Sequence, residues 1–240
     1  MKIIEKISAK AANNRDFGVV TLAFLGDSVT QGCFEIYRNG EGIATVYDQK
    51  SSYEQGVFNI LSTLYPSCPI NIINAGISGD RTGGGLERLE RDVISRSPDL
   101  CVVCFGLNDC SVEEGSVEHY TSNLRAIFEK LRLAGIEIIF MTPNMMNTTV
   151  SPHIADEGFK ALAARIADMQ NDGTFDAHIE AARVLCREMD VALCDCYAIW
   201  KRLAACGVNT TELLSNKINH PTREMDKMFS YELVKTMLEL

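Results

Sequence analysis

The sequence predicts an α/β fold in which helices cover both faces of a parallel sheet. Short apolar runs rich in Val, Ile, Leu and Cys alternate along the chain with longer amphipathic stretches. Strands buried on both faces have this continuous apolar character, and the helices between them supply the crossovers of a parallel sheet. There is no Pro/Ser-rich linker, internal repeat or low-complexity tract. The pattern therefore predicts a single three-layer αβα domain over residues 1–240.

Five apolar runs are the expected strands of this sheet. They are residues 19–25, 70–74, 100–105, 137–141 and 191–194. The segments 32–52, 144–156 and 206–220 carry no clear periodicity and are expected to be irregular. All three follow, or lie beyond, the carboxyl ends of predicted strands. Ligands bind at that edge of open α/β sheets, so we expect the functional residues there.

Helical periodicity is clearest in three of the other segments, where apolar residues recur every three or four positions. These segments are 53–65, 117–134 and 222–240. Ser116 is a suitable N-cap for the second of them, and Gly135 a suitable C-terminal stop. Thr222 is the expected N-cap of the last helix, directly after Pro221. The segments between the predicted strands are thus long enough for helical crossovers.

Composition and charge narrow the classes of partner. The chain has 46% hydrophobic and 23% charged residues, as is usual for globular proteins, and a formal net charge of −9. An acidic surface repels phosphate backbones and anionic lipids, which argues against nucleic acid and membrane as partners. No apolar stretch reaches the length of a membrane span, and residues 1–18 lack the apolar run of a signal peptide. A small uncharged substrate fits this composition better, and a homo-oligomer is left open.

The chain has nine cysteines, an odd number, and several lie inside apolar runs. A reduced thiol in such a run acts as a small buried hydrophobe, which favours the cytoplasm as the compartment. Cys101 and Cys104 have the spacing of a redox or zinc pair. Because they fall in a predicted strand, their thiols should point to opposite faces of the sheet, so we expect neither role.

The first motif with chemical character is residues 25–32 (LGDSVTQG), directly after the first predicted strand. A serine on a tight strand-to-helix turn exposes its hydroxyl and presents its own backbone N–H to the same pocket. Gly26 would permit the sharp turn. Ser28 is therefore a candidate nucleophile. The alternative is that Ser28 is only a helix N-cap.

Two further motifs follow the next two strands. Residues 74–82 (NAGISGDRT) contain glycines that let the backbone approach a ligand, although the tract could be a simple turn. The tract does not fit the glycine spacing of nucleotide-binding loops. Residues 106–109 (GLND) offer the side-chain amide of Asn108 as a neutral donor to a developing oxyanion, or as an Asx-turn residue.

The fourth motif is residues 219–222 (NHPT), before the last predicted helix. Histidine is the side chain whose pKa best suits removal of a hydroxyl proton near neutral pH, which makes His220 a candidate general base. The chain has four histidines. His119 and His178 fall inside amphipathic segments, whereas His153 lies in a predicted loop near the same edge and is the rival base.

Together, these four motifs resemble those of the SGNH (GDSL-type) hydrolase family. GDS, NAGISG, GLND and NHP occur in the family's order at the expected places, so the resemblance covers nearly the whole chain. It implies the SGNH hydrolase fold, with a flavodoxin-like five-stranded parallel sheet in the order 2-1-3-4-5. It also implies Ser28 as nucleophile, His220 as base, and an oxyanion hole formed by the Ser28 N–H, the Gly79 N–H and the Asn108 side chain. No metal or organic cofactor is implied.

The sequence departs from the family's pattern in two places. The family usually has an Asp three residues before its histidine, where this chain has Lys217. A lysine side chain cannot accept the imidazole Nδ1–H. A backbone carbonyl near Lys217, the Asn216 side chain or a distant carboxylate could accept it, or catalysis could run as a Ser–His dyad. In addition, relatives acting on sugars often have a Gly-His pair where this chain has Met225 and Asp226.

The reaction implied by the resemblance is acyl transfer through Ser28, in a serine esterase acting on small esters such as acetylated carbohydrates. Lysophospholipase and thioesterase activities stay open. Substrate choice is expected from loops 33–50 and 144–156, in which Phe34, Tyr37 and Tyr47 either wall a pocket or anchor the first loop. The alternative, favoured by Lys217, is a non-catalytic or weakly active SGNH-like module that binds an acylated ligand. A flavin-binding flavodoxin-like protein would need a Ser/Thr-rich phosphate loop after the first strand, which this chain lacks.

Overall fold

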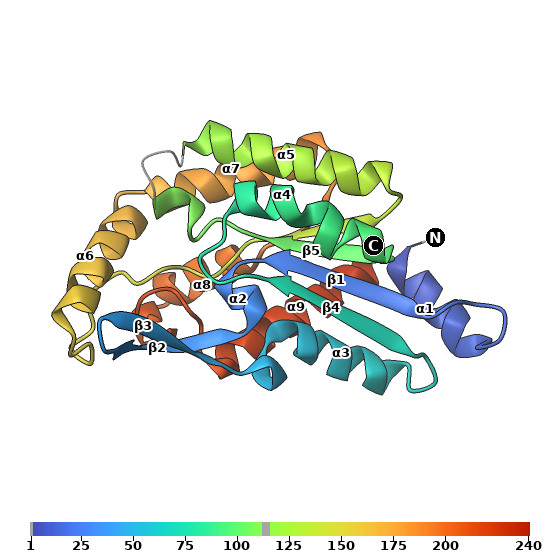
Figure 1. The fold of residues 1–240 in the computed structure, drawn as a ribbon, viewed down its shortest axis with the longest axis horizontal. Helices are drawn as coiled ribbons and strands as arrows, with labels where there is room; N and C mark the ends of the chain where they lie inside the picture. Colours follow the sequence, from blue (N-terminus) through green and yellow to red (C-terminus); the bar gives the residue numbers. More distant parts are fainter. Residues whose placement is uncertain (1, 112–115) are drawn as a thin grey trace.

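A five-stranded parallel sheet forms the centre of the computed structural model, which describes residues 2–111 and 116–240 (Figure 1). The spatial order of the strands is β4-β1-β5-β6-β7, which is 2-1-3-4-5 along the chain and confirms the predicted topology. The strands are β1 (Val20–Gly26), β4 (Ile70–Gly76), β5 (Leu100–Cys104), β6 (Glu137–Met141) and β7 (Ala192–Cys194). The predicted bounds lie within two residues of these.

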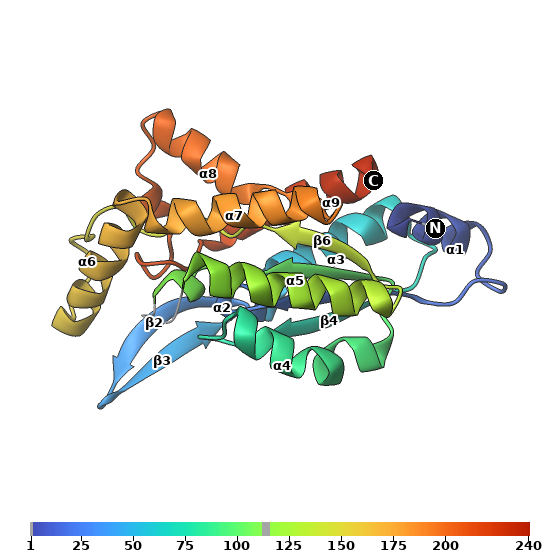
Figure 2. The ribbon, with the colours of Figure 1, turned by 90° about the horizontal axis from the view of Figure 1, so that it is seen from above.

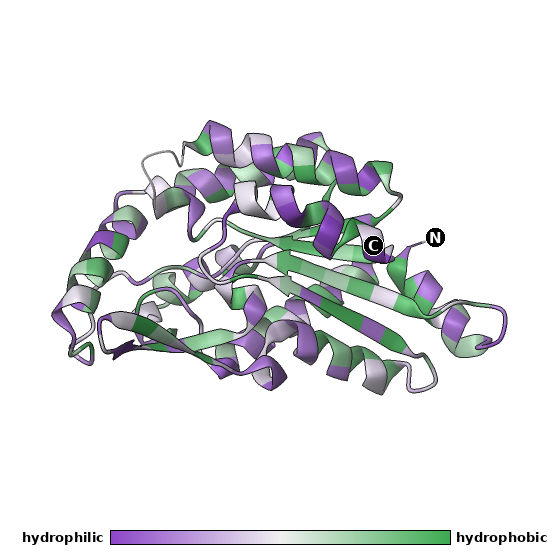
Figure 3. Cartoon of the chain, viewed as in Figure 1, coloured by the Kyte–Doolittle hydropathy of each residue, from purple (hydrophilic) through white to green (hydrophobic). Residues whose placement is uncertain are grey.

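Helices cover both faces of the sheet, which gives the expected three layers. The helices of the described residues are α1 (Ile3–Ala12), α2 (Ser28–Gln31), α3 (Tyr53–Leu64), α4 (Thr82–Asp92), α5 (Val117–Leu133), α6 (Glu157–Asn171), α7 (Thr174–Glu188), α8 (Cys196–Ala205) and α9 (Arg223–Glu239). Helices α4, α5 and α7 lie over one face, and α1, α3 and α9 over the other (Figures 1 and 2). The sheet strands are largely apolar, as expected of strands covered on both faces, whereas the edge strand β4 carries some polar positions (Figure 3).

The helix caps and the helix stop predicted from the sequence have the expected contacts and conformation. The Ser116 hydroxyl accepts the His119 N–H at the start of α5, and Thr222 accepts the Met225 N–H at the start of α9. Gly135, just beyond α5, has a φ of 72°, a left-handed conformation that glycine adopts without strain. Cys101 and Cys104 belong to the two different apolar clusters on either side of the sheet, so their thiols do point apart.

The prediction that residues 32–52 are irregular is wrong. Strands β2 (Cys33–Asn39) and β3 (Gly42–Tyr47) pair there as an antiparallel hairpin, separate from the main sheet. The two residues of the turn are Gly40 and Glu41, and Gly40 has a φ of 60°, as the first central residue of a two-residue hairpin turn commonly does. The hairpin projects beyond the carboxyl ends of the sheet strands, as does α6 (Figure 1).

The parallel register places the strand ends that carry the motifs next to one another. Gly26 at the end of β1 is level with Gly76 of β4 on one side and with Cys104 of β5 on the other. The segments that follow these three strands therefore start from one edge. Among the described residues, no helix is both long enough and apolar enough to cross a bilayer.

Candidate active site

Ser28 is the first residue of α2 and directly follows the turn at the end of β1. The N-cap of this helix is Asp27, whose carboxylate accepts the Val29 N–H at 3.0 Å, so Ser28 itself is not the cap. A side chain at Gly26 would collide with the Thr30 hydroxyl and would lie 2.7 Å from the Cys104 carbonyl oxygen. The glycine therefore allows the close approach between the serine turn and strand β5.

The Ser28 hydroxyl and the His220 imidazole are hydrogen-bonded, with 2.9 Å between Oγ and Nε2. The two residues lie 192 positions apart in the sequence, and both are buried, with exposed fractions of 3% and 6%. Asn216 holds the loop of His220 in place, because its side-chain oxygen accepts the backbone N–H groups of Ile218, Asn219 and His220. Contacts within the protein thus hold the imidazole against the serine.

The other imidazole nitrogen points to a backbone carbonyl. His220 Nδ1 lies 2.9 Å from the carbonyl oxygen of Phe34, in strand β2 of the hairpin. A carbonyl only accepts, so Nδ1 carries the proton and Nε2 is left as the acceptor for the Ser28 hydroxyl. None of the acceptors expected from the sequence takes this proton: the acceptor is a backbone carbonyl, but it belongs to the hairpin and not to the vicinity of Lys217. The Lys217 ammonium instead pairs with Glu212 at 3.0 Å.

Burial lowers the pKa of His220 to about 4. The hydrogen bond to the Phe34 carbonyl and the negative charge of Glu35 act in the opposite direction, but burial has the larger effect. The imidazole is therefore neutral at neutral pH. Neutral imidazole is the form that can take a proton from a hydroxyl.

Two hydrogen bonds attach the loop after β4 to the serine turn. The Ile77 N–H donates to the Gly26 carbonyl at 3.1 Å, and the Ser78 N–H donates to the side-chain oxygen of Gln31 at 2.7 Å. Gly79, the next residue, has a φ of 78°, which turns the backbone in a direction that other residues rarely adopt. The glycine predicted for an oxyanion hole thus lies in a loop fixed to the nucleophile turn.

Asn108 lies against the same loop. Its side-chain amide donates one N–H to the Asp80 carbonyl at 2.9 Å. A primary amide has two N–H groups, so the second is available for a ligand oxygen. Next to it, the buried Asp109 carboxylate accepts both the N–H and the hydroxyl of Thr82, at 3.0 and 2.5 Å. The structure therefore gathers Ser28, Gly79, Asn108 and His220 at one edge of the sheet.

Arg88 of α4 connects the carboxyl ends of β1 and β4 through hydrogen bonds. It was not identified from the sequence as a functional residue. Its buried guanidinium donates to the Gly26 carbonyl at 2.9 Å, the Ala75 carbonyl at 2.6 Å and the Asp80 carboxylate at 2.7 Å. One side chain thus satisfies acceptors on the nucleophile turn and on the Gly79 loop. Glu87, Glu90 and Arg91 lie close to Arg88 in the sequence, so nothing there distinguishes it from a surface arginine.

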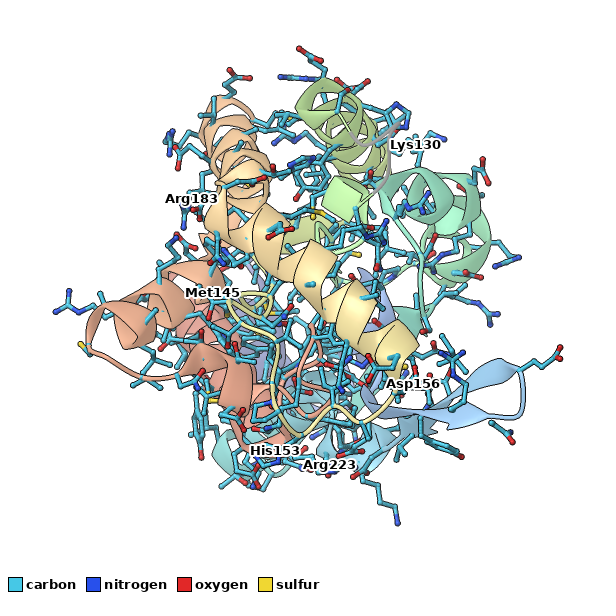
Figure 4. The ribbon with its side chains drawn as sticks, turned by 90° about the vertical axis from the view of Figure 1, so that its left-hand side faces the viewer. Lys130, Met145, His153, Asp156, Arg183 and Arg223 are labelled. Atoms are coloured by element: carbon cyan, nitrogen blue, oxygen red, sulfur yellow. The ribbon has the colours of Figure 1, made fainter. Side chains whose placement is uncertain are left out.

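Of the hairpin aromatics, Phe34 takes the anchoring role and Tyr37 lines a cavity. Phe34 is buried and acts as an anchor, whereas Tyr37 and Tyr47 are half exposed. A cavity of about 390 Å³ lies between the hairpin and the loop that holds His153. Its lining includes Tyr37, Arg38, His153, Asp156 and Lys217. Figure 4 views this face of the molecule and labels His153, Asp156 and Arg223.

The remaining histidines occupy other places. His119 and His178 lie on α5 and α7, as predicted, and His153 lies in the loop before α6. Among residues 2–111 and 116–240, no group of three or more His, Cys, Asp or Glu side chains could hold a metal ion.

Comparison with known proteins agrees with this arrangement. The model of the GDSL-like lipase/acylhydrolase family matches residues 24–227. An acetylxylan esterase of Geobacillus stearothermophilus is 31% identical over 131 residues, which cover 51% of this chain and 58% of that protein. The matched region thus spans little more than half the length of this curated relative.

Solved structures share the fold over most of the chain. The crystal structure of Axe2, an acetylxylan esterase from Geobacillus stearothermophilus, has a TM-score of 0.68 at 20% identity and covers 91% of this chain and 94% of its own. A two-domain esterase (CEX) active on acetylated mannans has a TM-score of 0.68 at 17% identity, covering 99% of this chain and 53% of its own.

Proposed function

Because the chain belongs to the GDSL-like lipase/acylhydrolase family, we propose that it is a serine esterase that removes small acyl groups, acetyl above all, from carbohydrates. The single observation that carries this proposal is the 2.9 Å contact between Ser28 Oγ and the unprotonated Nε2 of His220. A serine paired with a fixed, neutral imidazole can be activated as a nucleophile.

In the proposed reaction, Ser28 Oγ attacks the ester carbonyl while His220 Nε2 takes the hydroxyl proton. The carbonyl π electrons move to oxygen, and the resulting oxyanion faces the N–H groups of Ser28 and Gly79 and the free N–H of Asn108. Collapse of the tetrahedral intermediate expels the alcohol, which takes the proton from His220. Water then repeats the sequence on the acyl-enzyme, releasing the acid and restoring Ser28.

The preference for an acetylated carbohydrate is supported by two features. Relatives at the level of fold include esterases described as acting on acetylxylan and on acetylated mannans. The cavity beside the hairpin combines the half-exposed Tyr37 ring with the paired side chains of Arg38 and Asp156. An aromatic face with planar charged groups beside it is suited to a sugar ring and its hydroxyls.

A comparison of substrates tests the proposal. We expect p-nitrophenyl acetate to be cleaved faster than p-nitrophenyl esters of long acyl chains, and acetylated xylo- or manno-oligosaccharides to release acetate. A fluorophosphonate should label the wild type but not Ser28→Ala. Faster cleavage of long chains would point to a lipase. Labelling that persists in Ser28→Ala would remove Ser28 from its role, and ligand binding without turnover would indicate a binding module.

A further inference from the structure

Arg223 connects the start of α9 to both strands of the hairpin. It lies three residues after His220, and its guanidinium contacts Glu35 through two bonds, Nη1–Oε1 at 2.6 Å and Nη2–Oε2 at 3.2 Å. Its Nε donates to the Asp48 carboxylate at 2.8 Å. Glu35 belongs to β2, and Asp48 directly follows β3. One side chain thus fixes the hairpin to the helix that His220 precedes.

The same guanidinium also packs on Phe34. Its central carbon lies 4.3 Å from the centroid of the Phe34 ring, which is 1% exposed. A planar cation over an aromatic face is an attractive contact, and a guanidinium can stack in this way while its edge binds carboxylates. Phe34 is therefore held through its ring by Arg223 and through its neighbour Glu35 by the ion pair.

The backbone of Phe34 lies where the hairpin ladder is interrupted. The pairing of β2 with β3 shifts register between Cys33 and Ile36, so Phe34 and Glu35 fall within the irregular stretch. A bulge of this kind redirects backbone groups away from the partner strand. Here it leaves the Phe34 carbonyl directed at His220 Nδ1, at 2.9 Å. A carbonyl outside a regular ladder depends on other contacts for its position.

We propose that Arg223 is a positioning residue for catalysis: it clamps the hairpin bulge so that the Phe34 carbonyl takes the place of the aspartate that usually orients the histidine in this family. The inference rests on the proposed esterase function. The role is geometric, since the ion pairs are partly exposed and such pairs contribute little stability. When Arg223 is replaced, the carbonyl is still present in the chain but is less closely held.

The first experiment measures p-nitrophenyl acetate hydrolysis by Arg223→Met, Arg223→Lys and the wild type. We expect kcat of Arg223→Met to fall about 10–100-fold with little change in KM, the size of effect expected when a catalytic group is displaced by about 1 Å. Arg223→Lys should be intermediate, because a lysine can pair with one carboxylate but lacks the planar fork. Arg125→Met, which removes the surface pair with Glu188, is the matched control and should keep wild-type kcat.

The second readout is the Nδ1–H resonance of His220 in protein labelled with ¹⁵N-histidine, which does not require turnover. The wild type should show a protected Nδ1–H, and Arg223→Met should show faster solvent exchange or a mixture of tautomers. Should Arg223→Met not fold, Glu35→Gln and Asp48→Asn each weaken one arm of the clamp, and each should lower kcat in the same direction.

The outcomes separate this inference from the proposed function. A wild type without esterase activity or phosphonate labelling would end the proposed function, while the Nδ1–H signal would still test the clamp. A folded Arg223→Met with wild-type kcat, or with an unchanged Nδ1–H signal, would overturn the inference. A rise in KM at constant kcat would do so as well, because it would assign Arg223 to substrate binding.

Discussion

His220 Nδ1 donates to the main-chain carbonyl of Phe34, 186 positions away in the sequence, and not to a side chain of its own loop. A carbonyl fixes the tautomer and orientation of the ring as a carboxylate does. It carries no net charge, however, so it stabilises the imidazolium less during proton transfer. The expected behaviour of this site follows from that difference.

On the acid side of the pH–rate profile, activity should be lost only at an unusually low pH. With a folded-state pKa of about 4, against 6.5 for a free histidine, His220 stays neutral as the pH falls to about 5. We expect kcat/KM at pH 5.5 to be at least about nine tenths of its value at pH 7.5, whereas a histidine with a pKa of 6.5 would leave roughly one tenth. A loss of activity centred near pH 6.5 would contradict the effect of burial.

The same group contributes to the pH dependence of stability. The pKa of His220 is lower in the folded protein than in the unfolded chain. Its contribution to the free energy of unfolding is therefore fully present above pH 6.5 and is lost as the pH falls from there through about 4.

Restoring an acidic residue at position 217 should not improve the enzyme. The Nδ1–H is already taken up by Phe34, and the Lys217 side chain pairs with Glu212 and not with the imidazole. We expect kcat of Lys217→Asp to stay within about threefold of the wild-type value. The pH at which activity falls on the acid side should not change. Lys217→Asn removes the positive charge without adding a negative one and is the control. A large gain in kcat for Lys217→Asp alone would show that the carboxylate had displaced the Phe34 carbonyl.

Replacement of the two candidate bases should give opposite results. His220→Ala removes the acceptor of the Ser28 proton and should reduce kcat by about 10⁴ or more. His153→Ala should leave hydrolysis of p-nitrophenyl acetate nearly unchanged, because His220 already accepts the Ser28 hydroxyl. Steady-state kinetics of both variants checks this, and an exchange of the two effects would reassign the base.

Asn108→Ala should lower kcat by about 10²–10³ if its free N–H binds the oxyanion. The measurement is kcat for a short ester together with the rate of phosphonate labelling. Asn71→Ala, at an exposed position near the start of β4, is the control. Because Asn108 also holds the Asp80 carbonyl, the melting temperature of each variant should be compared. A normal kcat in a folded Asn108→Ala would exclude this side chain from the oxyanion hole.

Arg88→Met should destabilise the protein by about 3–5 kcal/mol, because it leaves the partly buried Asp80 carboxylate and two buried carbonyls without their donor. Arg91→Met, one turn along the same helix at a position 73% exposed, should change the free energy of unfolding by less than about 0.5 kcal/mol. Urea denaturation of both variants measures the difference. Equal stabilities would mean that Arg88 does not hold the strand ends together.

Much of the fold could be predicted because it depends on local patterns. The five apolar runs and the motifs at their ends determine which segments lie in the sheet and which residues gather at its edge. The strand order came from the family resemblance. The hairpin was missed although Gly40 marks its turn, because its strands are partly polar and mostly not buried, so they lack the continuous apolar character of the sheet strands.

The supporting contacts could not be predicted because they depend on tertiary distances. The Phe34 carbonyl has no signature in the sequence, and Arg88 and Arg223 look like ordinary helix-surface arginines until their partners are placed. The single domain over residues 1–240, the cytoplasmic location and a homo-oligomer stay predictions, as does the expectation that neither nucleic acid nor membrane is a partner.

The use of the main-chain oxygen of Phe34 also affects how this site can evolve. Every one of the twenty amino acids carries that oxygen, so no codon change at this position deletes it. Selection can preserve it only through the shape of the hairpin. A survey that scores triads by residue identity would count this site as missing a member, although the hydrogen bond is in place.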